Sequence, residues 1–535
     1  MSAAHVHLIL NHIPILGTLL GCERAISADR SATPKFAQVS LNEGQRMRTK
    51  RSGDSVVSQE ENRRPGWLAI LFVTVTLFVP SSLAQTTPSS QTAPSSPPSY
   101  KQLRYEEDWS FLRDQSRRAD MLDRIKYIPL GDKEDWYLTL GGEVRMQYER
   151  FGNPGWGQGP EDGSGYLLQR FMLHADLHLG DRARVFFQIK SGLESGRTGG
   201  PRPVDEDKLD VHQAFVDVTV PFGDERLLVL RAGRQELLFG SARLVGPREG
   251  PNVRQGFDGL RASLQAGAWR VDGFVAKPVE TRPGLFDDAS DQTRTFWGVY
   301  AVRPLALPPN GNLDLYYLGI DRKQAQFDQG TARETRHSIG VRLWGQRQAW
   351  DYNCEIIYQM GKFGRGKIRA WTAGSDLGYT LRSIRFRPRL GLKADVASGD
   401  RDRSKHNLQT FNALFPRGQY FGDAGLIGLA NLMDLHSSLD FHIAERLTVT
   451  GDWAFFWRES EGDGIYGNGI NLLRSGQTSR ARSIGSQPSL LIEWKANRHI
   501  TFETSWTYFL AGQFLKETMP GRNLDYITAR VTYKF

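Results

Sequence analysis

The densest group of basic side chains lies in one short stretch of the sequence. The arginines of residues 230–254 are Arg231, Arg234, Arg243, Arg248 and Arg254. A guanidinium stays charged at physiological pH and meets a carboxylate with two parallel N–H groups. This stretch therefore predicts a surface that binds carboxylate-bearing molecules. The alternative is that these arginines pair with neighbouring acids and brace the structure.

Residues for enzymatic chemistry are sparse by comparison. His174 and His178 lie four positions apart, which in a strand separates them by about 13 Å. This distance suits two separate polar positions better than one metal site. The only cysteines are Cys22 and Cys354, so a disulfide scaffold and a Cys-rich metal site are excluded. We expect no enzyme activity, no metal and no cofactor.

Composition narrows the class of protein further. The chain has 535 residues, of which 39% are hydrophobic, and no apolar run is long enough for a transmembrane helix. Its net charge of +9 comes from 68 basic residues interspersed with 59 acidic ones. Because no long Lys/Arg block occurs, nucleic acid is not an expected partner.

From Trp136 onward, polar and apolar residues alternate with a period of two, which is typical of β-strands. The segments 137–148, 167–179, 387–396 and 446–458 each have one charged and one apolar face. Turn residues rich in Gly, Asp, Asn and Pro separate such segments. The charged faces carry further candidate site residues: Glu143, Arg145, Arg170, Arg389, Lys393, Asp395 and Arg458.

Charges of both signs at successive positions of one face favour a water-filled lumen over the surface of a soluble sandwich. In a transmembrane barrel the apolar face meets lipid and the polar face lines the lumen. Trp and Tyr recur at strand ends, and the last strand ends on Phe535, a feature that the barrel assembly machinery recognises. We predict an all-β fold, a transmembrane antiparallel β-barrel of 16–18 strands over residues 135–535.

The N-terminal part indicates export from the cytoplasm. Residues 67–79 form a short apolar core that follows Arg63 and Arg64 and precedes a small-residue cleavage site at Ala84, as in a secretory signal peptide. We interpret residues 1–84 as a start codon placed too early plus this signal peptide. A Ser/Pro-rich linker (85–100) and a periplasmic helical lead (101–134), with a short polar helix over Tyr105–Lys126, would follow.

Three tripeptides carry a resemblance to a known family. They are Gly-Arg-Gln at 233–235, Ser-Gly-Asp at 398–400 and Phe-Trp-Arg at 456–458. In order and spacing the chain resembles the alginate export family of outer-membrane proteins over residues 135–535. The resemblance implies an 18-stranded monomeric barrel whose electropositive constriction lets an anionic polyuronate leave the periplasm. It places Arg234 and Arg458 at that constriction.

These observations together predict a passive export channel in the outer membrane of a Gram-negative bacterium. Expected partners are an anionic polysaccharide or small anions, outer-membrane lipid and lipopolysaccharide, the assembly machinery through Phe535, and periplasmic export proteins. Two alternatives stay open: a porin for small organic or sugar acids, and a barrel-embedded hydrolase or adhesin. The expected pore-lining residues are Arg145, Arg170, Arg231, Arg234, Arg243, Arg254, Arg389, Lys393, Arg458, Glu143 and Asp395.

Overall fold

The computed structural model describes residues 99–133, 135–221, 223, 226–305 and 311–535. The predicted signal peptide and nearly all of the predicted linker lie outside the described residues. Within the described part, no helix is long and apolar enough to cross a membrane.

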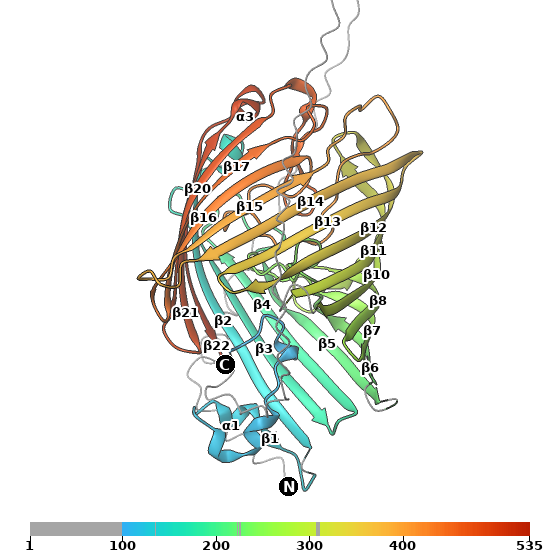
Figure 1. Cartoon of the computed structure of the whole chain (residues 1–535), viewed down its shortest axis with the longest axis vertical. Helices are drawn as coiled ribbons and strands as arrows, with labels where there is room; N and C mark the ends of the chain where they lie inside the picture. The colour runs from blue at the N-terminus through green and yellow to red at the C-terminus, as the bar shows by residue number, and fades with distance from the viewer. Residues whose placement is uncertain (1–98, 134, 222, 224–225, 306–310) are drawn as a thin grey trace, which may run out of the picture. The chain divides into compact units, whose positions relative to one another are not determined.

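Eighteen long antiparallel strands form one closed sheet (Figure 1). Each long strand pairs with the next along the chain, and β22 pairs with β2 from Glu143↔Lys534 to Gly152↔Asp525, which closes the barrel. The predicted fold class is thereby confirmed. The strands are β2 (Trp136–Gly152), β3 (Tyr166–Leu179), β4 (Ala183–Ser195), β5 (Asp207–Pro221), β6 (Arg226–Gln235), β7 (Phe257–Ala266), β8 (Trp269–Glu280), β10 (Arg294–Leu305), β11 (Gly311–Phe327), β12 (Gly330–Arg347), β13 (Trp350–Phe363), β14 (Gly366–Thr380), β15 (Arg389–Ala397), β16 (Leu432–Ala444), β17 (Leu447–Trp457), β20 (Ser483–Lys495), β21 (Ile500–Ala511) and β22 (Leu524–Lys534).

Short elements complete the described chain. The two-residue strands β1 (Ile128–Pro129) and β9 (Ala289–Ser290) extend the barrel sheet, and β18 (Ile465–Tyr466) pairs with β19 (Leu472–Arg474) in a separate ribbon. The connections also contain brief helical turns. These turns are α2 (Pro154–Gly157), η6 (Gly476–Thr478) and α3 (Gln513–Glu517).

The two faces of the sheet carry the side chains that the period of two predicts. On β3, Leu173 points outward and is 51% exposed, whereas Arg170 points into the lumen and is 2% exposed. The same alternation places Glu143 and Arg145 of β2 in the lumen. An apolar outer face and a charged inner face are what a membrane-embedded barrel requires.

The C-terminal residue completes the barrel seam. The Phe535 N–H donates to the carbonyl of Gly142 at 3.0 Å, and the Gly142 N–H donates back to Phe535 at 2.8 Å. The Phe535 ring stacks on Tyr533 with centroids 5.7 Å apart. A Cβ on Gly142 would lie 2.7 Å from that ring, so glycine leaves the space that the aromatic ring fills.

The N-terminal lead is not the continuous helix that the sequence predicts over Tyr105–Lys126. It consists of η3 (Arg104–Glu106), η4 (Ser110–Arg113), η5 (Gln115–Arg117) and a single turn, α1 (Asp123–Lys126). The Asp114 carboxylate accepts from the Ser116 N–H, and such local side-chain bonds compete with helix formation. The apolar side chains of the lead are also anchored separately, since Tyr105 packs on Phe186 and Phe215 inside the barrel.

Three connections fold into the barrel interior: residues 236–256, 398–431 and 458–482. Val245 forms a parallel bridge with Phe415, and these two segments pack against the lumen-facing Phe257 and Phe296. The main hydrophobic core therefore lies inside the barrel. The end of the barrel that holds the lead and Phe535 is called the lead end (Figure 1). The opposite end, where the connections 398–431 and 458–482 leave the strands, is called the loop end.

Candidate functional site

Six charged side chains meet inside the barrel, halfway along β2, and we call them the central cluster. Two strands supply three of them, and the connection 236–256 supplies the others. The members are Glu143 and Arg145 of β2, Arg170 of β3, and Glu236, Glu249 and Arg254. These six side chains carry three positive and three negative formal charges, and Lys534 of β22 adds a further cation 3.8 Å from Glu143.

Three arginines from three separate elements converge on one carboxylate, that of Glu249. Arg170 forms an ion pair with its Oε1, and the Arg254 Nη1 lies 3.0 Å from its Oε2. The Arg145 Nη1 approaches Oε1 to 3.9 Å. Such charge-assisted contacts are the strong ones in a protein interior.

The backbone next to Glu249 is held independently of its carboxylate. Arg145 donates to the carbonyl of Glu249 at 2.8 Å and to that of Pro251 at 3.0 Å. Arg170 reaches the same Glu249 carbonyl at 3.3 Å. The connection therefore stays anchored to the wall even if the carboxylate moves.

Exposure differs sharply between Glu249 and its partners. Its side chain is 34% exposed, while the side chains of Arg145, Arg170 and Arg254 are 1–3% exposed. The Glu249 side chain thus borders the accessible lumen, while its Oε2 is buried against the arginines. If it moved away, a carboxylate from solution would find three cationic donors already in place.

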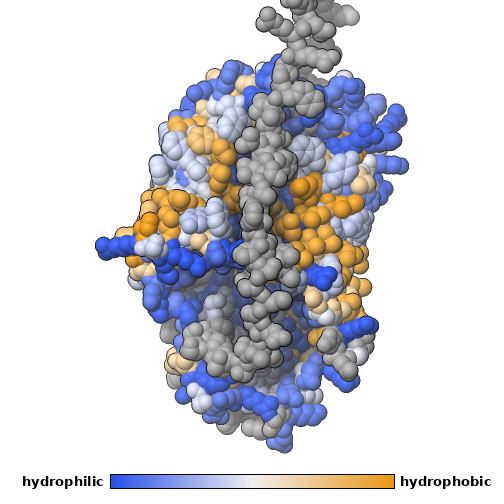
Figure 2. All heavy atoms as spheres, in the orientation of Figure 1, coloured by the Kyte–Doolittle hydropathy of each residue, from blue (hydrophilic) through white to orange (hydrophobic). Residues whose placement is uncertain are grey.

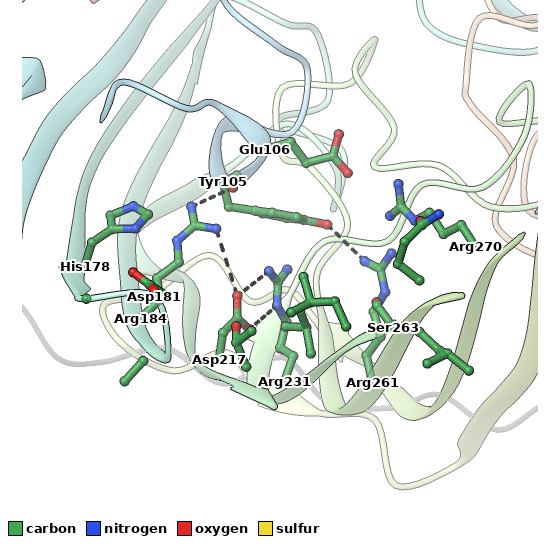
Figure 3. Close-up of a pocket in the computed structure, with 17 residues that line it drawn as sticks. Tyr105, Glu106, His178, Asp181, Arg184, Asp217, Arg231, Arg261, Ser263 and Arg270 are labelled. Carbon is green, nitrogen blue, oxygen red and sulfur yellow. Dashed lines mark hydrogen bonds and ion pairs between the residues drawn. The ribbon is translucent and has the colours of Figure 1, made fainter. Parts of the chain in front are cut away.

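A second charged region lies at the lead end, in a pocket of about 480 Å³. Tyr105 of the lead projects into it between Arg184, Arg231 and Arg261 (Figure 3). The Arg231 guanidinium stacks over the Tyr105 ring at 4.1 Å and over the Phe215 ring at 3.8 Å. The lead therefore forms one wall of this pocket.

The arginines of the lead-end pocket alternate with acids across neighbouring strands. Arg184 of β4 donates to Asp176 of β3 at 2.6 Å, and Arg231 of β6 donates to Asp217 of β5 at 2.7 Å. Further along the wall, Arg261 of β7 donates to Asp272 of β8 at 3.0 Å. Cross-strand pairs of opposite charge stabilise a sheet, so this ladder braces the wall as well as lining the pocket.

Of the expected lumen residues, Arg389, Lys393 and Asp395 lie on β15 in the opposite wall. Arg243 of the connection 236–256 forms an ion pair with Asp395 of β15 and thereby links that connection to the far side of the barrel. Lys393 lines a second cavity of about 280 Å³, together with Arg417 and Asp452. Arg389 pairs with acids of neighbouring strands, at 2.9 Å to Asp351 and 3.3 Å to Asp440.

Arg234 lies on the other side of the wall from Arg231. Three positions separate the two residues, and a strand turns such residues to opposite faces. Arg234 donates to both carboxylate oxygens of Asp258, at 2.8 and 3.2 Å, and to the carbonyl of Val211 at 3.0 Å. Its guanidinium braces strand ends against the segment that contains Asp288, whose carbonyl it also reaches.

Arg458 is fully buried between connections at the loop end. Its guanidinium donates to the carbonyls of Glu461, Asp463, Ser479 and Ala481 and lies 4.0 Å from the Phe514 ring centroid. Arginine has five N–H donors, and these contacts use all of them. No donor is left for an anion that passes through the lumen.

The Ser-Gly-Asp tripeptide joins the same two connections. The Gly399 N–H donates to Glu459 at 3.0 Å, and the Asp400 N–H donates to Asp463 at 2.9 Å. A Cβ on Gly399 would lie 2.0 Å from the Asn431 amide oxygen, so no larger residue fits there. The tripeptide therefore locks the segment 398–431 to the segment 458–482.

Asp400 makes this lock sensitive to pH. Burial raises the pKa of its carboxyl to about 6, and the nearby charges of Asp463 and Asp402 act in the same direction. Because the folded state holds the proton more tightly than the unfolded state, stability should fall as pH rises from about 4 through 6. We expect protease resistance of segment 398–431 to decrease over this range, and Asp400→Asn to flatten the profile. The exposed Glu445→Gln variant, in the turn between β16 and β17, is the control, and an unchanged profile in Asp400→Asn would contradict the assignment.

Sequence reasoning missed several residues that form these regions. Glu236 and Glu249 lie within the arginine-rich stretch 230–254, but their role depends on the connection folding inward, which no local pattern indicates. Tyr105 was expected in a helix and instead enters the barrel, where its hydroxyl donates to the Glu236 carbonyl at 2.9 Å. The opposite faces of Arg231 and Arg234, in contrast, could have been inferred from their spacing.

Comparisons with known proteins agree with this architecture. A family model described as alginate export matches residues 136–530. The chain resembles a BenF-like porin from Pseudomonas fluorescens, with 11% identity, coverage of 74% of this chain and 98% of that one, and a TM-score of 0.51. It also resembles OccK8 (OprE) of Pseudomonas aeruginosa, with 11% identity, coverage of 74% of this chain and 98% of that one, and a TM-score of 0.50. A search of curated proteins finds no match.

Proposed function

Since the chain belongs to the alginate export family, we propose that it is a passive channel of the Gram-negative outer membrane that exports an anionic polysaccharide of the polyuronate type. The observation that carries this proposal is the convergence of Arg145, Arg170 and Arg254 on a carboxylate inside the barrel. A polyuronate presents one such carboxylate on each sugar unit.

The charge pattern suits transit rather than tight capture. Guanidinium groups lower the barrier for anions, and conduction requires sites that bind weakly and repeatedly. Acids accompany the arginines throughout, such as Asp217 beside Arg231 and Asp272 beside Arg261. These acids weaken the hold of any single arginine on the polymer.

The proposed route runs from the lead end, which faces the periplasm, to the loop end, which faces outward. It passes the lead-end pocket and the central cluster, where Glu143 and Glu249 weaken the attraction of the arginines for the polymer. Lys393 and Asp395 contribute further along. In this proposal Arg234 and Arg458 shape the wall and the loop end instead of contacting the polymer.

The surroundings of the barrel follow from the same proposal. Outer-membrane lipid and lipopolysaccharide surround the apolar outer face, and the assembly machinery reads the last strand through Phe535. Periplasmic export proteins would contact the lead. The eighteen long strands that the structure describes form a closed sheet without an unpaired edge for a partner subunit, which favours a monomer.

A porin for small anions is the second candidate, and the size of the cavities favours it. Volumes of about 480 and 280 Å³ match sites for small molecules. The connections 236–256 and 398–431 occupy much of the remaining interior. Organic or sugar acids would pass such cavities without any rearrangement of these segments.

Single-channel recording in planar bilayers separates the two candidates. We expect anion selectivity, and block by oligouronates that tightens with chain length while neutral oligosaccharides of equal length block weakly. High salt should relieve the block, because charges are screened over about 10 Å at 0.1 M salt. Equal block by single sugar acids and oligomers would favour the small-anion porin. Equal block by neutral sugars would contradict both candidates.

A further inference from the structure

An exposed group of basic side chains lies on the outer face of the barrel near the loop end. Lys362 of β13 and Lys367 and Arg369 of β14 are all exposed, and the turn between these strands adds the exposed Arg365. Strand alternation turns the three strand residues outward, in line with Met360 and Trp371, which are 37% and 39% exposed. We call Lys362, Lys367 and Arg369 the outer basic patch.

The patch concentrates like charge without compensation. Lys362 and Lys367 are direct cross-strand partners, and Arg369 is opposite Met360, one diagonal step from Lys362. Like charges placed directly opposite each other destabilise a sheet. Within the described part of the chain, none of the three side chains has an ion pair or a hydrogen bond, whereas the neighbouring Arg333 pairs with Asp321 at 3.1 Å.

The position of the patch relative to the apolar belt points to its ligand. Trp371, Tyr358 and Met360 form the nearest part of the belt, and Trp side chains mark the membrane–water interface of barrels. A strand rises about 3.3 Å per residue, so Arg369 and Lys367 lie roughly 7 and 13 Å beyond Trp371 along β14. In Figure 2 the rim on this side of the barrel is hydrophilic above a hydrophobic band.

We propose that the outer basic patch binds the phosphate groups of lipid A, the phosphorylated glycolipid anchor of lipopolysaccharide in the outer leaflet. The inference rests on the proposed outer-membrane location, with the loop end facing outward. Three uncompensated cations at headgroup height offer charge complementarity to a phosphorylated lipid, and the acyl chains of that lipid would cover the apolar belt below. Bound phosphate also removes the repulsion between Lys362 and Lys367.

The test uses the purified full chain in neutral detergent, with binding of bisphosphorylated lipid A followed by native mass spectrometry. Each cation near a charged membrane surface contributes about a fivefold change in binding. We therefore expect the triple variant K362Q/K367Q/R369Q to bind roughly 100-fold more weakly than the wild type. The matched control R382Q/R385Q/R387Q removes three exposed cations from the turn between β14 and β15 at the lead end and should bind within about twofold of wild type.

Thermal stability gives a second readout that does not depend on the triple variant. In neutral detergent at low salt, K362Q should raise the melting midpoint because it removes a like-charge pair. With lipid A the order should reverse, and the wild type should be the more stable protein. Equal binding by wild type and the triple variant, or equal loss in both triple variants, would overturn the proposal.

Two further comparisons are needed. One distinguishes binding of lipid A from binding of free phosphate, and the other distinguishes the lipid A proposal from the channel proposal. Inorganic phosphate at the same concentration should give no comparable thermal gain, and an equal gain would replace the lipid site by a free-anion site. Neither lipid A binding nor thermal stability depends on conductance. If oligouronates fail to block the channel but lipid A binding still depends on the patch, the proposed function is contradicted and the lipid A site is not.

Discussion

Replacement of Glu249 with Gln is expected to increase anion selectivity and to tighten oligouronate block about tenfold, the value of one additional charge-assisted contact of about 1.4 kcal/mol. The substitution removes one negative charge from the central cluster and so raises its formal charge by one. It retains a side-chain oxygen for Arg170, and Arg145 still anchors the backbone carbonyls of Glu249 and Pro251. The change therefore frees guanidinium donors without releasing the connection.

Reversal potentials in asymmetric KCl and block by oligouronates measure this effect. Glu503→Gln is the matched control, because Glu503 of β21 is also a partly exposed carboxylate on the inner face but has a single arginine partner, Arg530, at 3.2 Å. The control should change both quantities much less. Equal values for Glu249→Gln and wild type would mean that the central cluster does not control anion passage.

Replacement of Arg458 with Met is expected to destabilise the loop end by about 3 kcal/mol or more, because each buried polar group left without a partner costs about 1–3 kcal/mol. The carbonyls of Glu461, Ser479 and Ala481 lose their donor at once, while the carbonyl of Asp463 keeps the Asn431 side-chain amide. Methionine keeps an apolar contact with the Phe514 ring. Ion selectivity should stay unchanged in the fraction that folds, because the guanidinium has no free donor.

Heat-modifiable migration, melting midpoints and proteolysis within 458–482 check this prediction. Arg482→Gln serves as the control, since the Arg482 side chain is 51% exposed and forms one exposed ion pair with Glu461 at 3.2 Å. Such a pair contributes about 0–1 kcal/mol. A stable Arg458→Met protein with a shifted reversal potential would instead return Arg458 to the channel lining.

Local patterns in the sequence were enough to predict the barrel. The period of two distinguishes lumen from lipid face along each strand, as Arg170 and Leu173 illustrate on β3. The closing strand was also predictable, because Phe535 ends a segment with an apolar outer face. These features depend on strand geometry alone, because successive side chains of a strand point to opposite faces whichever segments pack against it.

The family tripeptides were visible in the sequence, but their role was not. Gly233 has φ +130°, and a Cβ there would lie 2.2 Å from the Ala214 carbonyl oxygen. Arg234, Gly399 and Arg458 likewise fix backbone positions in the structure. Only glycine fits where two backbone segments approach closely, and few side chains can donate to several buried carbonyls. These structural requirements restrict the residue types of such motifs whether or not the motif contacts a substrate.

Which charges meet inside the barrel was decided only by the tertiary structure. Glu249, Arg254 and Arg243 lie in a connection without a period, so no pattern states that it folds inward and joins β2 and β3 to β15. The lead is a similar case, because Tyr105 enters the barrel to contact residues more than 100 positions away, such as Arg231 and Glu236. The sequence by itself determined the faces of the wall, since strand geometry is local. The fold determined the occupants of the lumen, because their positions depend on packing between segments distant in the chain.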